Sequence, residues 1–561
     1  MIHRHHQKKS LLHRNFQNSI EAKVKEKPYK LTPFFVTFCE GELTSIDIRH
    51  FLEYGLKIIC FKMSKVTRAD KITMLDMIKD AVQWYCVKYE VSTWPLTISI
   101  DIPNACIRTG FLKDEIPGMG VEIREDCTVE ITAKASLWNK CDSSLIYIDD
   151  PYTIKNIPCG TEMSIRFGQI VMIVTEVVDD LTLKCKCLQG GMLRSLEFVC
   201  VRGIKHTRPP LSKADLELIA FAKEFQLDII TVNSIRTPQT LQRIRKLFES
   251  HHSMPLLMST ICEQEGLDNI DEIIKLSDGI ILAREFLAYE IVNQQKLVTI
   301  QLQLSAKCVQ AGKPFYLSGN ILESTLVTGN LTGCDLIDIT NGVLQGAGFV
   351  MKHYKNLANV TYAMRHLDII CKAVEPLTSK TNDFRRLCDN VMPVNAAQAA
   401  TMACVLLAKV SEALAIIVPT VTGVTARWVS QMIPEAAILA ITTSAKVARK
   451  LNIYRGIVPI VYDQAKLDWH EEMEERVKFA VKYGIKYDIL KYGAHYVAFK
   501  KSCPTSAYAD NISSWIVMTE ENKKNKTCAS SRLITGELSS GEIKVAALII
   551  GRPDIFYRLP F

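Results

Sequence analysis

The sequence lacks any run of about 20 consecutive apolar residues, the length that a membrane-spanning helix needs. Its most apolar stretch, residues 394–418, is interrupted by polar and charged residues, namely Asn395, Gln398, Lys409 and Glu412. This pattern favours a buried helix followed by a short strand. We therefore expect a protein that does not insert into a membrane and that works in the cytoplasm.

Regular cysteine spacing is also absent, although the chain contains 18 cysteines. Together with the lack of a recognisable secretory leader, this predicts free thiols in a reducing compartment. Cys185 and Cys187 fall on one face of a predicted strand, but no second pair completes a set of zinc ligands. The basic residues, which give a net charge of +8, form no stripe interleaved with aromatic residues. We therefore expect no nucleic-acid partner.

Acidic residues are missing before Glu21, whereas arginine and lysine recur there. Residues 1–30 are therefore predicted to form a basic, solvated N-terminal tail, with a mitochondrial targeting segment as the alternative. At the other end, residues 520–526 are mostly charged, which is typical of a solvated linker. They open a C-terminal extension, residues 520–561, to which the sequence assigns no function.

What the sequence does contain is a series of short, apolar, β-branched runs with helical stretches between most of them. Strand and helix alternate eight times, which argues for an α/β fold built on a (β/α)8 TIM barrel. The runs are residues 34–38, 56–61, 96–101, 227–232, 255–260, 279–283, 313–317 and 335–340. The gap between the third and fourth runs is too long for one loop, and residues 122–201 alternate apolar and polar side chains. This predicts a small inserted β-barrel domain.

The predicted organisation has three folded parts. The barrel covers residues 31–110 and 204–390, the inserted β domain covers residues 111–203, and a C-terminal α/β domain covers residues 391–519. Ser212 is a predicted helix N-cap where the chain returns to the barrel. The predicted strands of the C-terminal domain are residues 414–418, 437–441, 458–462 and 495–499.

Short motifs, taken in their order along the chain, carry a resemblance to a known family. They read Ile107-Arg108-Thr109-Gly110, Ser277-Asp278-Gly279, Gly312-Lys313-Pro314 with Leu322-Glu323-Ser324, and Tyr454-Arg455-Gly456-Ile457. Over about residues 34–517 the chain resembles the pyruvate kinases. The resemblance implies the three-part architecture above, a homotetramer, and the glycolytic transfer of phosphate from phosphoenolpyruvate to ADP with Mg²⁺ and K⁺.

The chain departs from the family where the resemblance places catalytic and magnesium-binding residues. Cys60 replaces an arginine that stabilises phosphate charge, Thr260 replaces a catalytic lysine, and Gly319 replaces a threonine linked to proton transfer. The two magnesium carboxylates are replaced by Cys262 and Phe286. A phenyl ring cannot coordinate a hard cation, which requires oxygen ligands.

The potassium site that the resemblance implies is half retained. Ser64 and Asp101 remain, whereas Lys62 and Ile102 replace an asparagine and a threonine. The Lys62 ammonium either substitutes for the ion or reaches solvent. Arg108 remains as a vestige of the substrate or nucleotide site.

Two further features at the predicted strand ends each leave two interpretations open. Cys60, Cys106 and Cys262 replace polar family residues at neighbouring strand ends, which fits either a soft-metal or redox site, or drift of a relaxed site toward small buried residues. Three basic side chains either hold an anionic metabolite or merely reach solvent, namely Lys62, Lys65 and Arg108.

A second site follows from the resemblance to the family's sugar-phosphate effector loop, Thr-Lys-Ser-Gly-Arg-Ser, which here reads as residues 420–425. Hydroxyls and amides at a helix N-terminus suit a phosphate. The candidate effector residues are Thr420, Thr422, Gly423, Thr425, Trp469 and Arg476. Val421 and Val424 replace the two basic residues of the loop, so the alternative is a Thr-Gly turn beside a core tryptophan.

These losses predict the function class. Removing one preorganised charge-stabilising group costs on the order of 10²–10³ in rate, and several are missing here. Glu263 and Glu285 lie one position from the lost carboxylates and are expected to face other directions. We expect a pyruvate kinase-like pseudoenzyme that assembles with itself or with active relatives, or binds an anionic metabolite. The alternative is a functional pyruvate kinase that uses Mg²⁺ and K⁺.

Overall fold

The computed structural model of the chain describes residues 29–38, 44–62, 66–104, 106–113, 119–204, 210–249, 254–291, 293–352, 357–377, 395–464 and 468–518. The predicted C-terminal extension and most of the predicted N-terminal tail lie outside these residues. Two predicted site residues, Ser64 and Lys65, also lie outside them.

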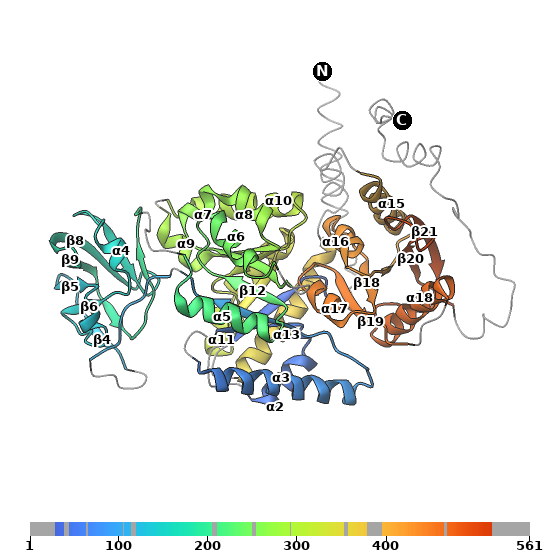
Figure 1. Cartoon of the computed structure of the whole chain (residues 1–561), viewed down its shortest axis with the longest axis horizontal. Coiled ribbons are helices and arrows are strands. Elements are labelled where there is room, and N and C mark those ends of the chain that lie inside the picture. Colours follow the sequence, from blue (N-terminus) through green and yellow to red (C-terminus); the bar gives the residue numbers. More distant parts are fainter. Residues whose placement is uncertain are drawn as a thin grey trace, which may run out of the picture.

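Eight strands close into a barrel in the order β1-β16-β15-β14-β13-β12-β3-β2 (Figure 1). Every neighbouring pair is parallel. The strands are β1 (Phe34–Phe38), β2 (Ile58–Lys62), β3 (Thr97–Ile102), β12 (Ile229–Val232), β13 (Leu256–Ile261), β14 (Gly279–Ala283), β15 (Phe315–Ser318) and β16 (Gly348–Lys352). The predicted (β/α)8 barrel is confirmed, and all the predicted runs except the last overlap a barrel strand.

The eighth predicted strand, residues 335–340, is wrong, because this segment lies in helix α12 (Gly333–Leu344). Thr332 caps the helix: its side chain accepts from the Asp335 amide, and the Asp335 carboxylate accepts from the Thr332 amide. Ile339 and Val343 are four residues apart and both buried, which is the helical period. The barrel closes through β16 instead.

Helices follow the barrel strands and cover the outside of the barrel (Figure 1). They are α2 (Ser45–Glu53), α3 (Arg68–Lys88), α5 (Lys213–Glu224), α6 (Pro238–Lys246), α7 (Gln264–Asp268), α8 (Ile270–Leu276), α9 (Arg284–Glu290), α10 (Lys296–Gln310), α11 (Glu323–Thr328), α12 and α13 (Leu357–Val374). Ser212 caps α5 by accepting from the Asp215 amide, so the predicted N-cap is confirmed.

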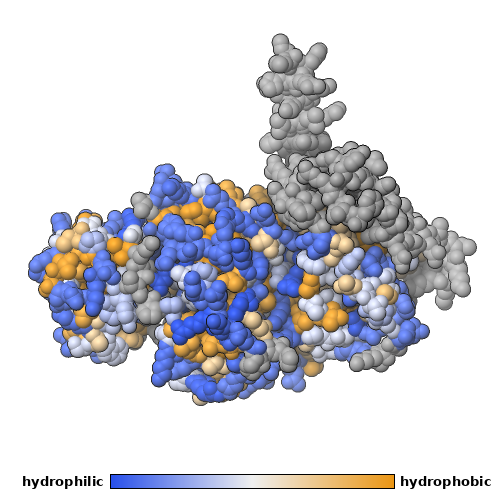
Figure 2. All heavy atoms as spheres, turned by 45° about the horizontal axis from the view of Figure 1, so that its top comes forward, coloured by the Kyte–Doolittle hydropathy of each residue, from blue (hydrophilic) through white to orange (hydrophobic). Residues whose placement is uncertain are grey.

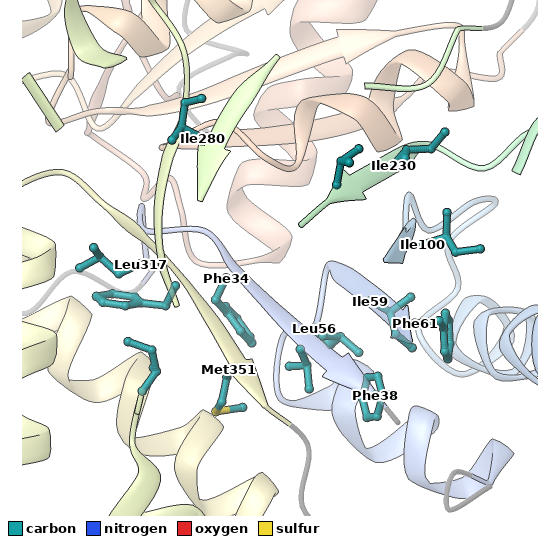
Figure 3. Close-up of a cluster of buried hydrophobic side chains, with 14 of the residues drawn as sticks. Phe34, Phe38, Leu56, Ile59, Phe61, Ile100, Ile230, Ile280, Leu317 and Met351 are labelled. Carbon is teal, nitrogen blue, oxygen red and sulfur yellow. The ribbon is translucent and has the colours of Figure 1, made fainter. Parts of the chain in front are cut away.

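Alternate residues of each barrel strand point to opposite sides, and both sides are packed. Phe34 and Phe38 of β1 join Ile59 of β2 in a cluster with residues of the surrounding helices (Figure 3). Phe35, between them in sequence, faces inward and meets the Tyr316 ring edge-on at 4.8 Å between centroids. The barrel interior is therefore filled, and space for a ligand is left to the strand ends.

The inserted β domain follows β3 and lies beyond one end of the barrel (Figure 1). It contains a six-stranded sheet in the order β11-β7-β8-β9-β5-β6 and a two-stranded sheet of β10 and β4. Its elements are β4 (Val121–Ile123), β5 (Thr128–Thr132), η1 (Ala135–Leu137), β6 (Leu145–Tyr147), α4 (Pro151–Ile154), β7 (Glu162–Ile165), β8 (Ile170–Asp179), β9 (Thr182–Gln189), β10 (Gly191–Leu193) and β11 (Val199–Val201). Cys185 and Cys187 are both buried in β9, as expected of ordinary strand residues.

The C-terminal domain holds a five-stranded sheet in the order β19-β18-β17-β20-β21. Its elements are α15 (Ala396–Val410), β17 (Ala415–Pro419), α16 (Val424–Gln431), β18 (Ala437–Thr442), α17 (Ala445–Leu451), β19 (Ile457–Val461), α18 (Trp469–Lys486), β20 (His495–Lys500) and β21 (Asn511–Ile516). The four predicted strands are confirmed. β21, which pairs antiparallel with β20, was not predicted.

The C-terminal domain is joined to the barrel at the amino ends of the barrel strands. The Tyr316 hydroxyl donates to the Ile453 carbonyl at 2.7 Å, and Arg449 Nε lies 2.9 Å from Asp228 Oδ1. Tyr29, at the end of the segment assigned to the tail, donates to the Leu414 carbonyl at 2.8 Å. Within the described ranges, no helix is both long and apolar enough to cross a membrane.

Candidate functional site

The candidate site lies at the carboxyl ends of the barrel strands, where the chain leaves β3 for the inserted domain. Strand register decides which side chains meet there. Lys62 of β2 lies beside Asp101 of β3, and Thr231 of β12 lies on the other side of Asp101. Cys60 packs in the inward-facing cluster, so the even-numbered residues of β2 point into the barrel. Residues from distant parts of the sequence therefore lie together at the carboxyl ends of the barrel strands, which we call the barrel mouth.

Asp101 is buried and held by the chain itself. Both of its carboxylate oxygens accept from Asn233 Nδ2 at 2.9 Å. Burial raises the pKa of Asp101, and the Lys62 ammonium opposes that rise. The same carboxylate acts on Cys60, whose pKa is raised to about 12 chiefly by burial and secondly by Asp101. The structure thus brings together Cys60, Lys62 and Asp101.

Cys106 and Cys262 meet around Ser234. Cys106 Sγ lies 3.2 Å from Ser234 Oγ, and Cys262 is almost fully buried. Burial raises the pKa of Cys106 to about 11 and raises that of Cys262 well above its ordinary value. Because the thiolate is the form that binds metals and attacks electrophiles, such neutral thiols are poorly suited to either task. In the part of the chain that the structure describes, no group of three or more His, Cys, Asp or Glu side chains is placed to share a metal ion.

The two nearby glutamates are paired with cations. Glu263 Oε2 lies 3.9 Å from Arg236 Nε, with both side chains buried. Glu285 Oε1 lies 3.6 Å from Lys352 Nζ, and the Glu285 side chain is also buried. Each carboxylate charge is therefore offset within the protein by a neighbouring side chain.

Glu285 occupies the space beside Gly319. A Cβ atom built on Gly319 would overlap Glu285 Oε2 and would lie 2.7 Å from the carboxyl carbon. Gly319 also has φ +89, a conformation that favours glycine. Arg284, the first residue of α9, fixes this arrangement by donating to the Gly319 carbonyl at 2.9 Å and to both oxygens of Asp338. The Glu285 carboxylate thus occupies the space that any side chain at position 319 would need.

Phe286 lies in an aromatic cluster that joins the barrel to the inserted domain. Its ring meets the Phe198 ring edge-on at 4.4 Å and the Phe167 ring at 5.1 Å. Phe167 and Phe198 stack at 5.9 Å, and Lys352 Nζ lies 5.6 Å from the Phe167 ring. The position that the family resemblance assigns to a magnesium ligand is therefore part of an apolar contact between two domains.

The remainder of α9 extends the same contact. Arg202 Nε donates to the Tyr289 carbonyl at 3.3 Å, and Cys200 Sγ donates to Glu290 Oε1 at 3.1 Å. A Cβ on Gly168 would overlap the Tyr289 ring, so the inserted domain approaches α9 as closely as its backbone allows. One short helix is thus held against the inserted domain along its length.

Magnesium and potassium do not fit these side chains. A buried neutral thiol at Cys262 and a phenyl ring at Phe286 offer no oxygen to a hard cation. Next to Asp101, the Lys62 ammonium already supplies a positive charge that a monovalent cation would have to displace. These side chains therefore do not form a suitable binding site for either ion.

The barrel, the β domain inserted at its mouth and the terminal α/β domain define a phosphotransferase-like architecture with the candidate site at the barrel mouth. Two sequence profiles match the chain: "Pyruvate kinase, barrel domain" over residues 38–365 and "Pyruvate kinase, alpha/beta domain" over residues 398–512. The chain belongs to the pyruvate kinase family.

Individual relatives agree with this assignment. Pyruvate kinase 1 of Candida glabrata is 31% identical over 414 residues, which cover 72% of this chain and 81% of the relative. Pyruvate kinase 1 of Saccharomyces cerevisiae is 30% identical with the same two coverages. Pyruvate kinase of Debaryomyces hansenii is 28% identical over 82% of this chain and 90% of its own length.

The second candidate site is built on the turn before α16. Thr420 is buried, and its Oγ1 accepts from the Gly423 amide at 2.9 Å, while Gly423 has φ +81. Thr422 is exposed, and Thr425 and Trp469 are half-buried. Arg476 is buried, paired with Glu472, and lies 5.5 Å from the Tyr462 ring. Thr420 and Arg476 thus have structural partners within the chain, as the Thr-Gly turn interpretation requires.

Sequence reasoning missed several residues that shape the mouth. Arg236, Ser234 and Lys352 contact predicted site residues but belong to none of the motifs. Phe167 and Phe198 lie in the inserted domain, far from Phe286 in sequence. One available signal was Gly319, where the family resemblance places a threonine, because a glycine there leaves space for another side chain.

Proposed function

We propose that this chain is a pyruvate kinase-family protein that does not transfer phosphate effectively and acts through assembly with copies of itself or with active relatives. The observation that supports the loss of phosphate transfer is the Phe286 ring, packed against Phe167 and Phe198 where the family resemblance places a magnesium carboxylate. Removing a preorganised charged group costs on the order of 10²–10³ in rate. Cys60, Thr260 and Cys262 remove further groups of this kind.

Binding of an anionic metabolite at the mouth is less well supported than assembly. Arg108 Nη1 donates to the Leu196 carbonyl at 3.0 Å, so this vestigial side chain serves the inserted domain. At the mouth, Arg236 and Lys352 are paired with Glu263 and Glu285, so their positive charges are already offset within the protein.

Apolar side chains on the outside of the barrel support assembly. On α12, Leu336, Ile337 and Leu344 are exposed, and on the adjacent α10 Val298 and Leu302 are exposed. Gln301 Nε2 on α10 donates to the Gln345 side chain, directly after α12, at 2.7 Å, so the two helices present one surface. Figure 2 shows apolar patches of this kind among the hydrophilic residues of the barrel. Contiguous exposed apolar surface marks interaction sites.

The test is the mass of the full chain in solution, measured by light scattering after size exclusion. Wild type is expected to run as an oligomer of the 63.2 kDa chain, and Ile337→Glu is expected to shift it toward the monomer. The physical reason is that an unpaired carboxylate would be buried in the interface. Val87→Glu, on the exposed face of α3, is the matched control and should leave the mass unchanged. A monomeric wild type, or an oligomer insensitive to Ile337→Glu, would contradict assembly through this surface.

A further inference from the structure

A small cavity of about 40 Å³ lies at the amino ends of β1 and β2, at the junction with the C-terminal domain. Residues 30–34 line it at the start of β1, Lys57 and Ile58 line it at the start of β2, and Tyr454 and Ile457 line it from the C-terminal domain. One water molecule needs roughly 10–15 Å³ of such space, so a molecule of a few heavy atoms fits. Nucleotides, sugars and acyl carriers are too large.

Lys57 lines this cavity without a partner for its charge. Within the described ranges, its ammonium forms neither a hydrogen bond nor an ion pair. The side chain is partly buried, and Nζ keeps accessible surface, so a molecule in the cavity reaches it. Burial lowers the pKa of Lys57 to about 8, and the positive charge of Lys30 contributes to the lowering. At pH 7.5 about a quarter of Lys57 is therefore a neutral amine, against roughly one part in a thousand for an ordinary lysine.

The carboxylates near the cavity are engaged by other groups. Asp368 of α13, which favours the charged form of Lys57, lies 2.7 Å from Lys372 Nζ and 3.8 Å from Lys30 Nζ. Glu375 accepts from the amide and the hydroxyl of the residue after Leu31, at 2.8 and 2.7 Å. The basic side chains thus outnumber the acidic ones, and the positive charge of Lys57 is left uncompensated.

The other walls are mostly apolar. Leu31, Pro33 and Ile457 line the cavity, and the Phe34 ring lies 4.0 Å from Lys30 Nζ. Because moving an ion from water into such surroundings is costly, the cavity favours a small uncharged molecule. A neutral lysine amine is a nucleophile, so a small electrophile would react there.

From these observations we infer that Lys57 is a modification site, at which its amine takes up carbon dioxide to form a carbamate. The nitrogen lone pair attacks the carbon of carbon dioxide and forms an N–C bond, while one C–O π pair moves to oxygen. The nitrogen then loses a proton to water, and no oxidant or second reactant is needed. The product is an anion that shares the cavity with the Lys30 ammonium, so a repulsive pair becomes an attractive one. The inference does not depend on the state of the barrel mouth.

The test is made on the full-length protein equilibrated with ¹³C-labelled bicarbonate and carbon dioxide. Carbamate is detected as a separate carbon resonance by ¹³C NMR. In parallel, triethyloxonium converts the carbamate into a stable ethyl carbamate, which tandem mass spectrometry assigns to one residue. The mapping is necessary because the α-amino group, with an ordinary pKa of about 7.7–8.0, also takes up carbon dioxide. Wild type is expected to carry the ethyl carbamate on Lys57, in an amount that increases with pH because the amine loses its proton.

Two sets of variants separate the roles of the lysines. Lys57→Arg keeps the charge but has no nucleophilic amine, so it should lose this modification. Lys213→Arg, at the exposed start of α5, is the matched control and should retain it. Lys30→Gln should weaken the uptake of carbon dioxide at Lys57 about tenfold or more, because the carbamate loses its cation, whereas Lys30→Arg should retain most of it.

Three outcomes would overturn the inference. The first is a wild-type protein with no ethyl carbamate on Lys57, a result that does not depend on the folding of any variant. The second is a carbamate resonance that is as strong in Lys57→Arg as in wild type, which would place the modification on another amine. The third is equal uptake at Lys57 in wild type and Lys30→Gln, which would show that the cavity does not stabilise the carbamate.

Discussion

Glu285 and Gly319 come from different strand ends, yet each determines what the other position can hold. The Glu285 carboxylate fills the space beside Gly319, and Arg284 holds the Gly319 carbonyl in place. The family resemblance places a threonine at position 319, where this chain has no side chain and the Glu285 carboxylate fills the space. The mouth is thus closely packed at this point.

This pairing predicts the effect of adding one methyl group. Gly319→Ala should destabilise the protein more than Gly55→Ala, by at least about 1 kcal/mol in the free energy of unfolding. Both glycines have a positive φ, +89 and +82, but a Cβ on Gly55 meets no atom within 4 Å. The difference between the variants therefore isolates the overlap with Glu285. Urea denaturation supplies the measurement.

The double variant Glu285→Gly/Gly319→Ala provides the internal check. The cost of adding Gly319→Ala should be smaller in the Glu285→Gly background than in the wild type, because the carboxylate no longer competes for the space. Equal losses in Gly319→Ala and Gly55→Ala would show that Glu285 does not occupy the position described here.

Part of the site could be predicted from the sequence, because strand period and strand register place residues reliably. Cys60, Asp101 and Cys262 were expected at neighbouring strand ends, and the structure places them there. The environment of Glu285 could not be predicted, since it depends on how α9 turns after β14. The contacts of Phe286 depend on where the inserted domain docks, which no local pattern specifies.

At the scale of elements, α9 is the point of attachment between the barrel and the inserted domain. Its residues Phe286, Tyr289 and Glu290 each contact the inserted domain, through a ring contact, a carbonyl and a carboxylate respectively. These contacts, one apolar and two polar, hold the inserted domain against the barrel mouth.

Shortening the central ring should therefore loosen the inserted domain. Phe286→Ala is expected to lower the free energy of unfolding by about 1–3 kcal/mol, the sum of two aromatic pair contacts. It should also speed limited proteolysis in the connections to the inserted domain, residues 103–120 and 202–212, followed by mass spectrometry. Phe286→Leu keeps apolar volume and should lose less. Unchanged cleavage in Phe286→Ala would contradict this role for the ring.

Most of the barrel strands were predicted correctly, whereas one predicted strand is a helix and β21 was not predicted. Seven barrel runs were located because each is a short apolar segment flanked by helical stretches. The run at residues 335–340 was misassigned because a few apolar residues fit both a strand and one face of a helix, and the Thr332–Asp335 capping box decides for the helix. β21 was not predicted because it is partly polar, and it lies at the sheet edge, where few apolar residues are needed.

At the scale of the whole molecule, the chain has the domain organisation of the pyruvate kinase family. The barrel core, the inserted domain and the C-terminal domain all retain packed interiors. The mouth instead holds buried thiols, paired glutamates and an aromatic cluster. We propose that a fold with such a mouth serves assembly, with the outer faces of α10 and α12 as the contact surface.

The most direct test of this account is steady-state turnover of phosphoenolpyruvate and ADP by the full-length protein, with Mg²⁺ and K⁺ present, coupled to lactate dehydrogenase. Pyruvate kinase 1 of Saccharomyces cerevisiae, a relative that is 30% identical, serves as the parallel control. The account predicts turnover below roughly 0.1 s⁻¹, a hundredth of a typical enzyme's rate. Turnover above that value, abolished by removing Mg²⁺, would show that the altered mouth still supports phosphoryl transfer and would contradict the account.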